Sequence, residues 1–205
     1  MGHTMHPQPG FPFALDLRID YLLSPGGLSV TTTATNIGPN RCPFGAGAHP
    51  WFLAGAPIDD TIVLRVPATT VLRSDDRGIP IEAIPVEGTE LDFREPRQVG
   101  SARLDHAFTG LARDADGLAR VTLRRPDGIG ITLWCDASYP YVMLTTGDVL
   151  PDVDRRSLAI EPMTCPPNAF QTGEALVTLA PGEAFTGRWG FSATLPADHG
   201  PRGST

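Results

Sequence analysis

Apolar and polar residues alternate along most of this 205-residue chain. From Phe13 to Tyr21 every second side chain is apolar, and Asp16, Arg18 and Asp20 stand between them. A period of two residues is typical of a strand with one buried face. No segment keeps an apolar period of 3.6 residues over three turns, so the pattern favours strands and allows only short, local helices.

Turn sequences separate these strand candidates from one another. The sequence SPGG at residues 24–27 precedes a β-branched run at 28–35, and this order predicts a hairpin. The sequence PDG at residues 126–128 is a second strong turn signal. Further strands are predicted at residues 61–66, 120–124, 130–135, 141–146, 157–161 and 185–194.

Composition supports one all-β domain. The chain is 41% hydrophobic and 19% charged, as expected of a globular chain long enough to bury one large core. Its 22 glycines and 21 prolines are scattered between apolar stretches and form no repeat, which is typical of many short strands joined by turns.

Charge and cysteine content narrow the function classes. A formal net charge of -7 disfavours nucleic acid and anionic membranes as partners and favours a neutral or cationic small ligand. Three cysteines without CxxC spacing indicate neither a disulfide framework nor a zinc site. The chain has no apolar run long enough to cross a bilayer, and its first residues lack the apolar core of a signal peptide. We therefore expect a cytoplasmic protein with reduced thiols.

Two stretches interrupt the strand pattern and are candidate site loops. Residues 41–59 are rich in glycine, alanine and proline and place a histidine beside aromatic residues. Residues 161–173 begin with a carboxylate and contain three prolines. Loops on a β scaffold are common positions for binding and catalytic residues.

His49 is the candidate in the first stretch. Four small residues at 45–48 allow the backbone to approach a ligand closely, and Trp51 and Phe52 could form an apolar wall. The following Pro50 holds His49 in an extended conformation. The alternative is an ordinary, partly buried histidine in a tight turn.

Glu161 is the candidate in the second stretch. In a strand, Leu158 and Ile160 share one face, and Ala159 and Glu161 share the other, where the small Ala159 leaves room beside the carboxylate. Pro162 removes the next backbone donor, which predicts that the strand ends there and opens into a cleft. The alternative is a solvated glutamate, the usual state of this residue type.

Asp105 and several aromatic residues are weaker candidates. Asp105 stands near Phe108, and a carboxylate beside an aromatic ring is a common way to hold a sugar. From the sequence alone, the favoured interpretation of Asp105 is an ordinary surface Asp-His turn. Trp51, Trp134 and Tyr141 could stack on a sugar, although large aromatic residues in a β-sandwich are more often core.

Several short motifs, taken in order, resemble the aldose 1-epimerase family. They are PGFPF at 9–13, TN at 35–36, GAGAHPWF at 45–52, LDHAF at 104–108, TTGD at 145–148 and EPMTCPPNAF at 161–170. LAPGE at 179–183 and WGF at 189–191 resemble the family's final strands. The resemblance covers nearly the whole chain.

The resemblance implies a fold and a reaction. The fold is a large antiparallel β-sandwich of the supersandwich type, and the reaction interconverts the α and β anomers of a free monosaccharide without cofactor or metal. The resemblance assigns Glu161 as the base at the C1 hydroxyl and His49 as the acid at the ring oxygen. It assigns Asp105 to sugar hydroxyls. Trp51 is our further candidate for substrate binding, from its aromatic ring beside His49. We expect His49 and Glu161 to face one another across one cleft, with Asp105 on its rim.

The chain also departs from the family pattern. Family members carry an upstream portion with an arginine and a second histidine that contact the sugar, and we expect this chain to lack it. We therefore expect an incomplete sandwich domain at residues 11–196, flexible segments at 1–10 and 197–205, weak or absent activity, and self-association through exposed sheet edges.

Two rival functions remain open. The first is a non-catalytic carbohydrate-binding protein on the same sandwich, in which His49 and Glu161 only hydrogen-bond a ligand. The second is a domain of a glycoside hydrolase or lyase, for which a pair of carboxylates would be expected.

Overall fold

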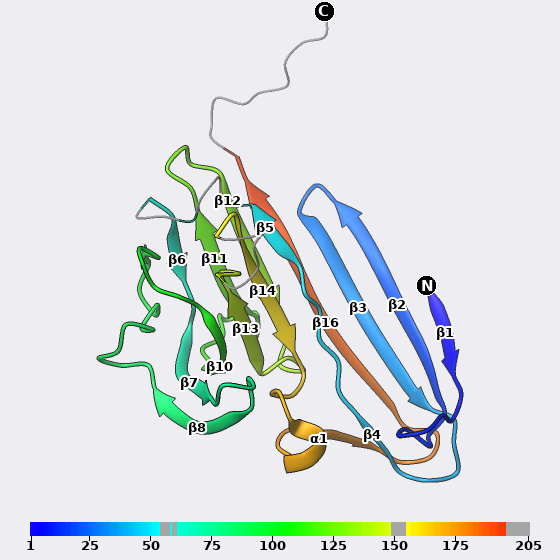
Figure 1. Cartoon of the computed structure of the whole chain (residues 1–205). Coiled ribbons are helices and arrows are strands. Elements are labelled where there is room, and N and C mark those ends of the chain that lie inside the picture. The colour runs from blue at the N-terminus through cyan, green and yellow to red at the C-terminus, as the bar shows by residue number, and fades with distance from the viewer. Residues whose placement is uncertain (54–57, 59–60, 149–154, 196–205) are drawn as a thin grey trace, which may run out of the picture.

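The computed structural model describes residues 1–53, 58, 61–148 and 155–195, and strands dominate this part of the chain (Figure 1). The only helix in it, α1 (Ala169–Thr172), has four residues. No helix in the same part is long and apolar enough to cross a membrane. The strands are β1 (Gly2–Met5), β2 (Leu15–Ser24), β3 (Gly27–Asn36), β4 (Cys42–Phe44), β5 (Trp51–Leu53), β6 (Val63–Arg65), β7 (Ala68–Ser74), β8 (Pro80–Pro85), β9 (Arg97–Gln98), β10 (Asp105–Leu111), β11 (Ala119–Arg124), β12 (Gly130–Cys135), β13 (Tyr141–Thr145), β14 (Ser157–Met163), β15 (Val177–Leu179) and β16 (Ala184–Thr194).

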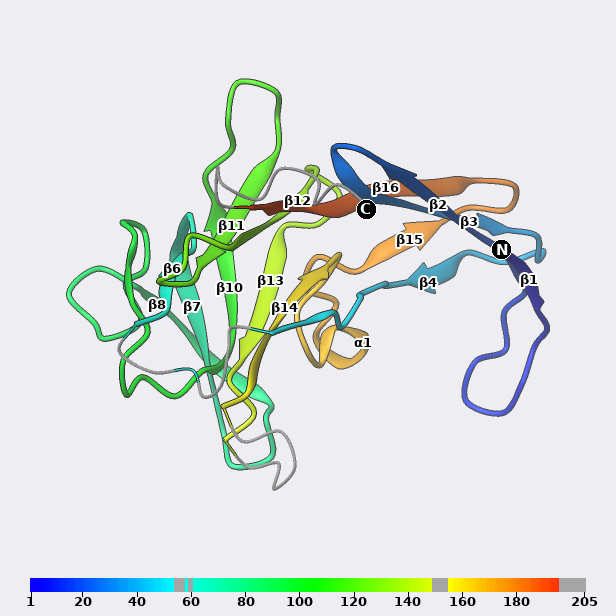
Figure 2. The same cartoon turned by 90° about the horizontal axis from the view of Figure 1, so that it is seen from above.

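Two large antiparallel sheets form the layers of the fold, as Figure 2 shows from above. The eight-stranded sheet has the order β1-β2-β3-β16-β12-β11-β6-β9, and the six-stranded sheet has the order β5-β14-β13-β10-β7-β8. The short strands β4 and β15 pair only with each other. The predicted all-β antiparallel fold is confirmed.

The main hydrophobic core lies between the two large sheets. Each sheet contributes alternate side chains to it, and those named here are less than 9% exposed. Val121, Leu133 and Trp189 come from the eight-stranded sheet, and Val71, Phe108, Leu144 and Ile160 come from the six-stranded sheet. Because both sheets bury one face in a common core, the architecture is a β-sandwich.

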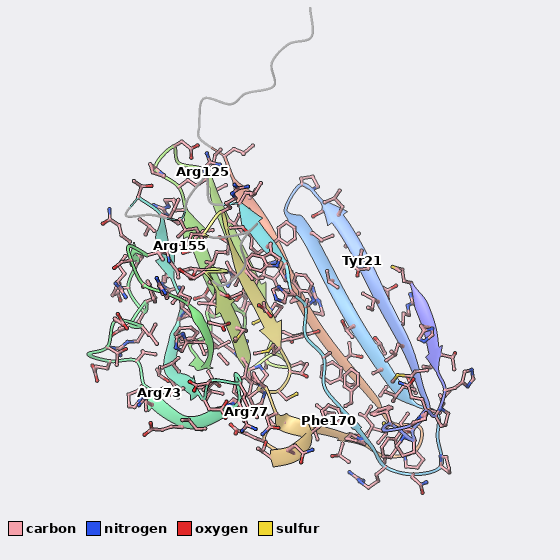
Figure 3. The ribbon with its side chains drawn as sticks, in the orientation of Figure 1. Tyr21, Arg73, Arg77, Arg125, Arg155 and Phe170 are labelled. Atoms are coloured by element: carbon pink, nitrogen blue, oxygen red, sulfur yellow. The ribbon has the colours of Figure 1, made fainter. Side chains whose placement is uncertain are left out.

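Strands β1, β2 and β3 extend the eight-stranded sheet beyond the six-stranded one, and we call these three strands the wing (Figure 1). The charged residues Asp16, Arg18 and Asp20 occupy one face of the wing, and apolar residues occupy the other. A second core cluster covers the lower part of the apolar face, whereas Tyr21 on that face is 56% exposed (Figure 3).

The strongly alternating strands lie where the sequence predicts them. The hairpin β2–β3 closes with Ser24 opposite Gly27, and the PDG turn joins β11 to β12. The sequence pattern missed β7, β8 and β10, in which burial does not follow a simple alternation. It also missed the three-residue strands β4 and β5 in the predicted loop 41–59.

Of the two segments predicted to be flexible, only the amino-terminal one lies within the described residues. Within the segment 1–10, predicted to be flexible, residues 2–5 form β1 and pair with β2 in register, with Met5 opposite Leu15. The carboxyl-terminal tail 197–205 lies outside the described residues.

Replacing Phe108 by alanine should destabilise the fold strongly. Phe108 is fully buried in the core face of the central strand β10, and such a truncation costs about 3–5 kcal/mol. The control Leu22→Ala, at a side chain 65% exposed on the wing, should change the free energy of unfolding by less than about 0.5 kcal/mol. Urea denaturation of both variants measures the difference, and equal losses would contradict the assigned core.

Candidate active site

The candidate site lies on the face of the six-stranded sheet that points away from the sandwich core. Ala159 of β14 pairs with Trp51 of β5 on one side and with Thr145 of β13 on the other. Thr145 in turn pairs with Asp105 of β10. Directly paired residues project from the same face of a sheet, so Trp51 and Asp105 lie on one face with Ala159 between them.

Glu161 occupies the next row of the same face. It pairs with Met143 of β13, and its side chain is 12% exposed. The predicted facing of β14 is therefore confirmed, since Ile160 is buried in the core. The predicted strand end at Pro162 is wrong, because Pro162 stays in register with Val142 and β14 continues to Met163.

Hydrogen bonds hold the loop that carries His49 against the end of β14. The Ala46 N–H donates to the Thr164 hydroxyl at 2.8 Å, and the Thr164 N–H donates to the Ala46 carbonyl at 2.9 Å. The Ala48 N–H donates to the Pro162 carbonyl at 3.2 Å. These bonds bring the residue before His49 beside the residue after Glu161.

Small residues make this close approach possible. A Cβ atom at Gly45 would lie 2.7 Å from the Cys165 Sγ, and one at Gly47 would lie 3.4 Å from the Met163 Cγ. Gly45 thus allows the loop to pack against the segment after Glu161, whereas a side chain at Gly47 would make only an ordinary contact. The sequence suggested close approach to a ligand instead.

The structure brings His49, Glu161 and Trp51 together. The His49 Nε2 lies 3.1 Å from the Glu161 Oε1. The imidazole also stacks on the Trp51 indole, with ring centroids 5.3 Å apart and an interplanar angle of 26°. The His49 side chain is 55% exposed, so a proton donor and a carboxylate stand in contact at a position open to solvent.

The environment of Glu161 makes it more basic than an ordinary glutamate. Burial, and secondly the negative charge of Asp105, raise the pKa of Glu161 from 4.5 to about 7. A group of this kind exchanges protons efficiently near neutral pH. Asp105 and Glu161 lie in adjacent rows of one sheet face, so the charge of Asp105 acts on Glu161 at short range.

Asp105 borders a surface pocket of about 190 Å³. The pocket is lined by Arg103, Leu104, Asp105, His106, Thr145 and Asp148. Through Asp105 and Thr145, this pocket adjoins the face that carries Glu161.

The other two aromatic candidates have different positions. Trp134 of β12 lies over Gly190 on the outer face of the eight-stranded sheet, which excludes it from this site. Tyr141 lies on the site face, where its hydroxyl donates to the Glu174 Oε1 at 2.9 Å.

The sequence pattern does not single out Met143 or Arg155. Met143 is the cross-strand neighbour of Glu161 and packs against the small apolar cluster of Leu72, Ala107 and Tyr141. Arg155 stands in a charged stretch that has the composition of a solvated loop, yet its side chain is only 18% exposed and binds Asp148 at 3.0 Å. Neither the cross-strand position of Met143 nor the contacts of Arg155 can be recognised from the neighbouring sequence. Within the described ranges, no group of three or more His, Cys, Asp or Glu side chains could hold a metal ion.

Comparison with known proteins identifies the family of this chain. The sequence model of the family described as aldose 1-epimerase matches residues 2–192. The Escherichia coli protein YihR, described as uncharacterized, is 31% identical over 179 residues, which are 86% of this chain and 55% of YihR. The chain spans about half the length of the curated relatives it matches.

Solved structures share the fold. A putative aldose 1-epimerase from E. coli K12 has a TM-score of 0.76 at 21% identity, covering 93% of this chain and 64% of its own. Galactose 1-epimerase from Lactobacillus acidophilus has a TM-score of 0.77 at 19% identity, covering 94% of this chain and 61% of its own. These similarities identify the sandwich as galactose mutarotase-like.

Replacing Asp105 by asparagine should lower the pKa of Glu161. The negative charge of Asp105 disfavours the ionised form of Glu161, and the amide removes that charge. NMR titration of ¹³C-labelled glutamate side chains measures the change. The control Asp127→Asn, in the β11–β12 turn, should leave the titration as it is. An unchanged pKa in Asp105→Asn would show that the carboxylates do not interact.

Replacing Glu161 by glutamine should stabilise the protein above neutral pH. Because the pKa of Glu161 is raised in the folded state, the folded protein binds more protons than the unfolded chain between pH 4.5 and 7. Wild-type stability should therefore fall as pH rises through this window, by about 2 kcal/mol, and Glu161→Gln should lack this fall. Urea denaturation at pH 5 and pH 8 compares them, with Glu95→Gln as the exposed control. A parallel pH dependence in wild type and Glu161→Gln would contradict the shift.

Proposed function

Because the chain belongs to the aldose 1-epimerase family, we propose that it interconverts the α and β anomers of a free aldose by acid–base ring opening. The observation that carries this proposal is the contact between His49 and Glu161, 3.1 Å apart on the solvent-facing side of the six-stranded sheet. The family and the fold support a mutarotase-like sugar epimerase. The residue roles and the substrate are our proposal.

The chemistry of ring opening explains why the two groups must be adjacent. The C1 hydroxyl oxygen and the ring oxygen of an aldose are bonded to the same carbon, so the base at one and the acid at the other must stand side by side. A donor and an acceptor in direct contact in the free protein can each turn to one of these oxygens when the sugar enters. This arrangement provides the proximity that acid–base catalysis requires.

The proposed reaction returns both groups to their starting states. The Glu161 carboxylate takes the proton of the C1 hydroxyl while protonated His49 donates a proton to the ring oxygen, and the C1–O5 bond breaks to give the open-chain aldehyde. Rotation about C1–C2 presents the other face of the carbonyl. On closure, the C5 hydroxyl attacks C1 and returns its proton to His49, and Glu161 returns its proton to the C1 oxygen. No metal ion or cofactor enters these steps.

The neighbouring side chains suit a sugar. Asp105 can accept hydrogen bonds from hydroxyl groups, and Trp51, 37% exposed on the same face, can pack against the C–H face of the ring. Glu161 lies opposite the apolar Met143 and is largely buried, which makes it a better proton acceptor than an exposed carboxylate. We propose that Asp105 and Trp51 hold the substrate while His49 and Glu161 act on it.

A non-catalytic carbohydrate-binding protein would use the same four residues as ligands only. Because the chain spans about half the length of its curated relatives, the activity of the whole protein is itself part of the proposal. Its cytoplasmic location and its self-association through sheet edges stay predictions from the sequence.

Glu161→Gln and His49→Asn should each lower kcat/KM for mutarotation by about 100-fold or more, with sugar binding largely retained. Polarimetry of fresh α-D-glucose and α-D-galactose measures the rate, and the pH profile of the wild-type protein should be bell-shaped. The exposed controls His6→Asn and Glu95→Gln should match wild type.

Two outcomes would count against this mechanism. A near wild-type rate in Glu161→Gln would reject Glu161 as the base. Saturable sugar binding without any acceleration of mutarotation by the wild-type protein would favour the carbohydrate-binding function.

A further inference from the structure

A partly buried arginine lies close to the start of β10, within the layered part of the molecule (Figure 3). The Arg155 Nε donates to the Ile58 carbonyl at 3.0 Å. Its Nη1 donates to the Ala102 carbonyl at 3.1 Å and to the Asp148 Oδ1 at 3.0 Å, and its Nη2 donates to the Gly100 carbonyl at 2.7 Å. One side chain thus ties together three segments that are distant in the sequence.

The backbone of Arg155 is held in an unusual conformation. Its φ angle is +50°, in the left-handed region, which costs about 1 kcal/mol or more for a residue other than glycine. The Arg155 N–H donates to the Thr146 carbonyl at 3.2 Å, and the Ile58 N–H donates to the Arg155 carbonyl. Hydrogen bonds from two neighbouring segments therefore maintain the conformation from which the side chain reaches residues 100–102.

The same cluster continues to the residue before Asp105. Thr146 is fully buried, and its hydroxyl contacts Asp148 and accepts a hydrogen bond from the Leu104 N–H at 3.0 Å. The Thr146 N–H donates to the Leu104 carbonyl at 2.9 Å. Arg155, Asp148 and Thr146 together therefore fix residues 100, 102 and 104.

Asp105 needs support of this kind because the sheet holds it on one side only. It pairs with Thr145 of β13, but the pairing of β10 with β7 begins at Ala107. Without the cluster, the first residues of β10 would be held by a single ladder of hydrogen bonds.

We propose that Arg155 is a positioning residue, which acts through Asp148, Thr146 and the carbonyls of residues 100 and 102 to hold Asp105 in place for the sugar. The inference rests on the proposed function, in which Asp105 binds sugar hydroxyls. Arg155 touches neither sugar nor the reacting atoms, and it acts by fixing the segment that carries Asp105.

Arginine is suited to this role by its geometry. Its planar guanidinium presents donors in several fixed directions, and here they reach three carbonyls and one carboxylate. A lysine at this position could satisfy only part of the set, and a methionine would keep much of the side-chain volume but none of the donors.

The expected effect is on substrate binding more than on turnover. Arg155→Met should raise the KM for the sugar by about tenfold, the effect of losing one hydrogen bond to a charged group, while kcat changes much less. Arg155→Lys should fall between Arg155→Met and wild type. The control Arg156→Met, at an exposed neighbouring residue, should match wild type.

A double-variant cycle identifies the route of the effect. Asp105→Asn should itself raise KM, because it weakens the contact with the sugar hydroxyls. If Arg155 acts through Asp105, adding Arg155→Met to Asp105→Asn should raise KM little further. Additive effects of the two changes would overturn the proposal. Equal KM values for Arg155→Met and wild type would also overturn it. If Arg155→Met does not fold, as judged by circular dichroism, Arg155→Lys and Asp148→Asn replace it in the same cycle.

A second measurement keeps the inference separate from the proposed reaction. Displacement of Asp105 should weaken its repulsion of Glu161, so Arg155→Met should lower the pKa of Glu161 in the same direction as Asp105→Asn does. NMR titration measures the pKa of Glu161 whether or not the protein has mutarotase activity. A lowered pKa without activity would support the positioning role and count against the proposed function, whereas an unchanged pKa would overturn the positioning role.

Discussion

The pleat of the six-stranded sheet is the constraint on which the candidate site depends. Along β14, Leu158 and Ile160 are fully buried in the sandwich core, and the residues between them point to the opposite face. A shift of register by one residue would send Glu161 into the core and expose Ile160. The hydrophobic contacts that stabilise the sandwich therefore also fix the direction of the carboxylate.

The remaining parts of the site are brought to this face at a cost in stability. The loop that carries His49 packs closely against the segment after β14 because Gly45 has no side chain. Glu161 is shielded from water near a second carboxylate, an arrangement that disfavours its charge and makes it a better base. The burial of Glu161 near Asp105 thus weakens the folded state and also favours proton transfer. The hydrophobic core offsets this loss of stability.

How far the sequence predicts this structure depends on the range of the contacts involved. The alternation along β2, β12 and β14 is a local property, so these strands and the facing of Glu161 could be predicted. Strand β10 begins with the polar pair Asp105 and His106. Because such a pair is also typical of a surface turn, the strand could not be predicted from it. Arg155 binds backbone carbonyls, which have no side-chain signature, and only the folded chain brings them within its reach.

The stack of His49 on Trp51 gives the site an intrinsic optical signal. Protonated imidazole quenches the fluorescence of an indole ring in contact with it. Of the other two tryptophans, Trp189 is buried in the core and Trp134 faces outward from the opposite sheet, so neither adjoins His49. A change at His49 should therefore alter the emission of Trp51 and of neither other tryptophan, which gives the site a signal in solution without substrate or label.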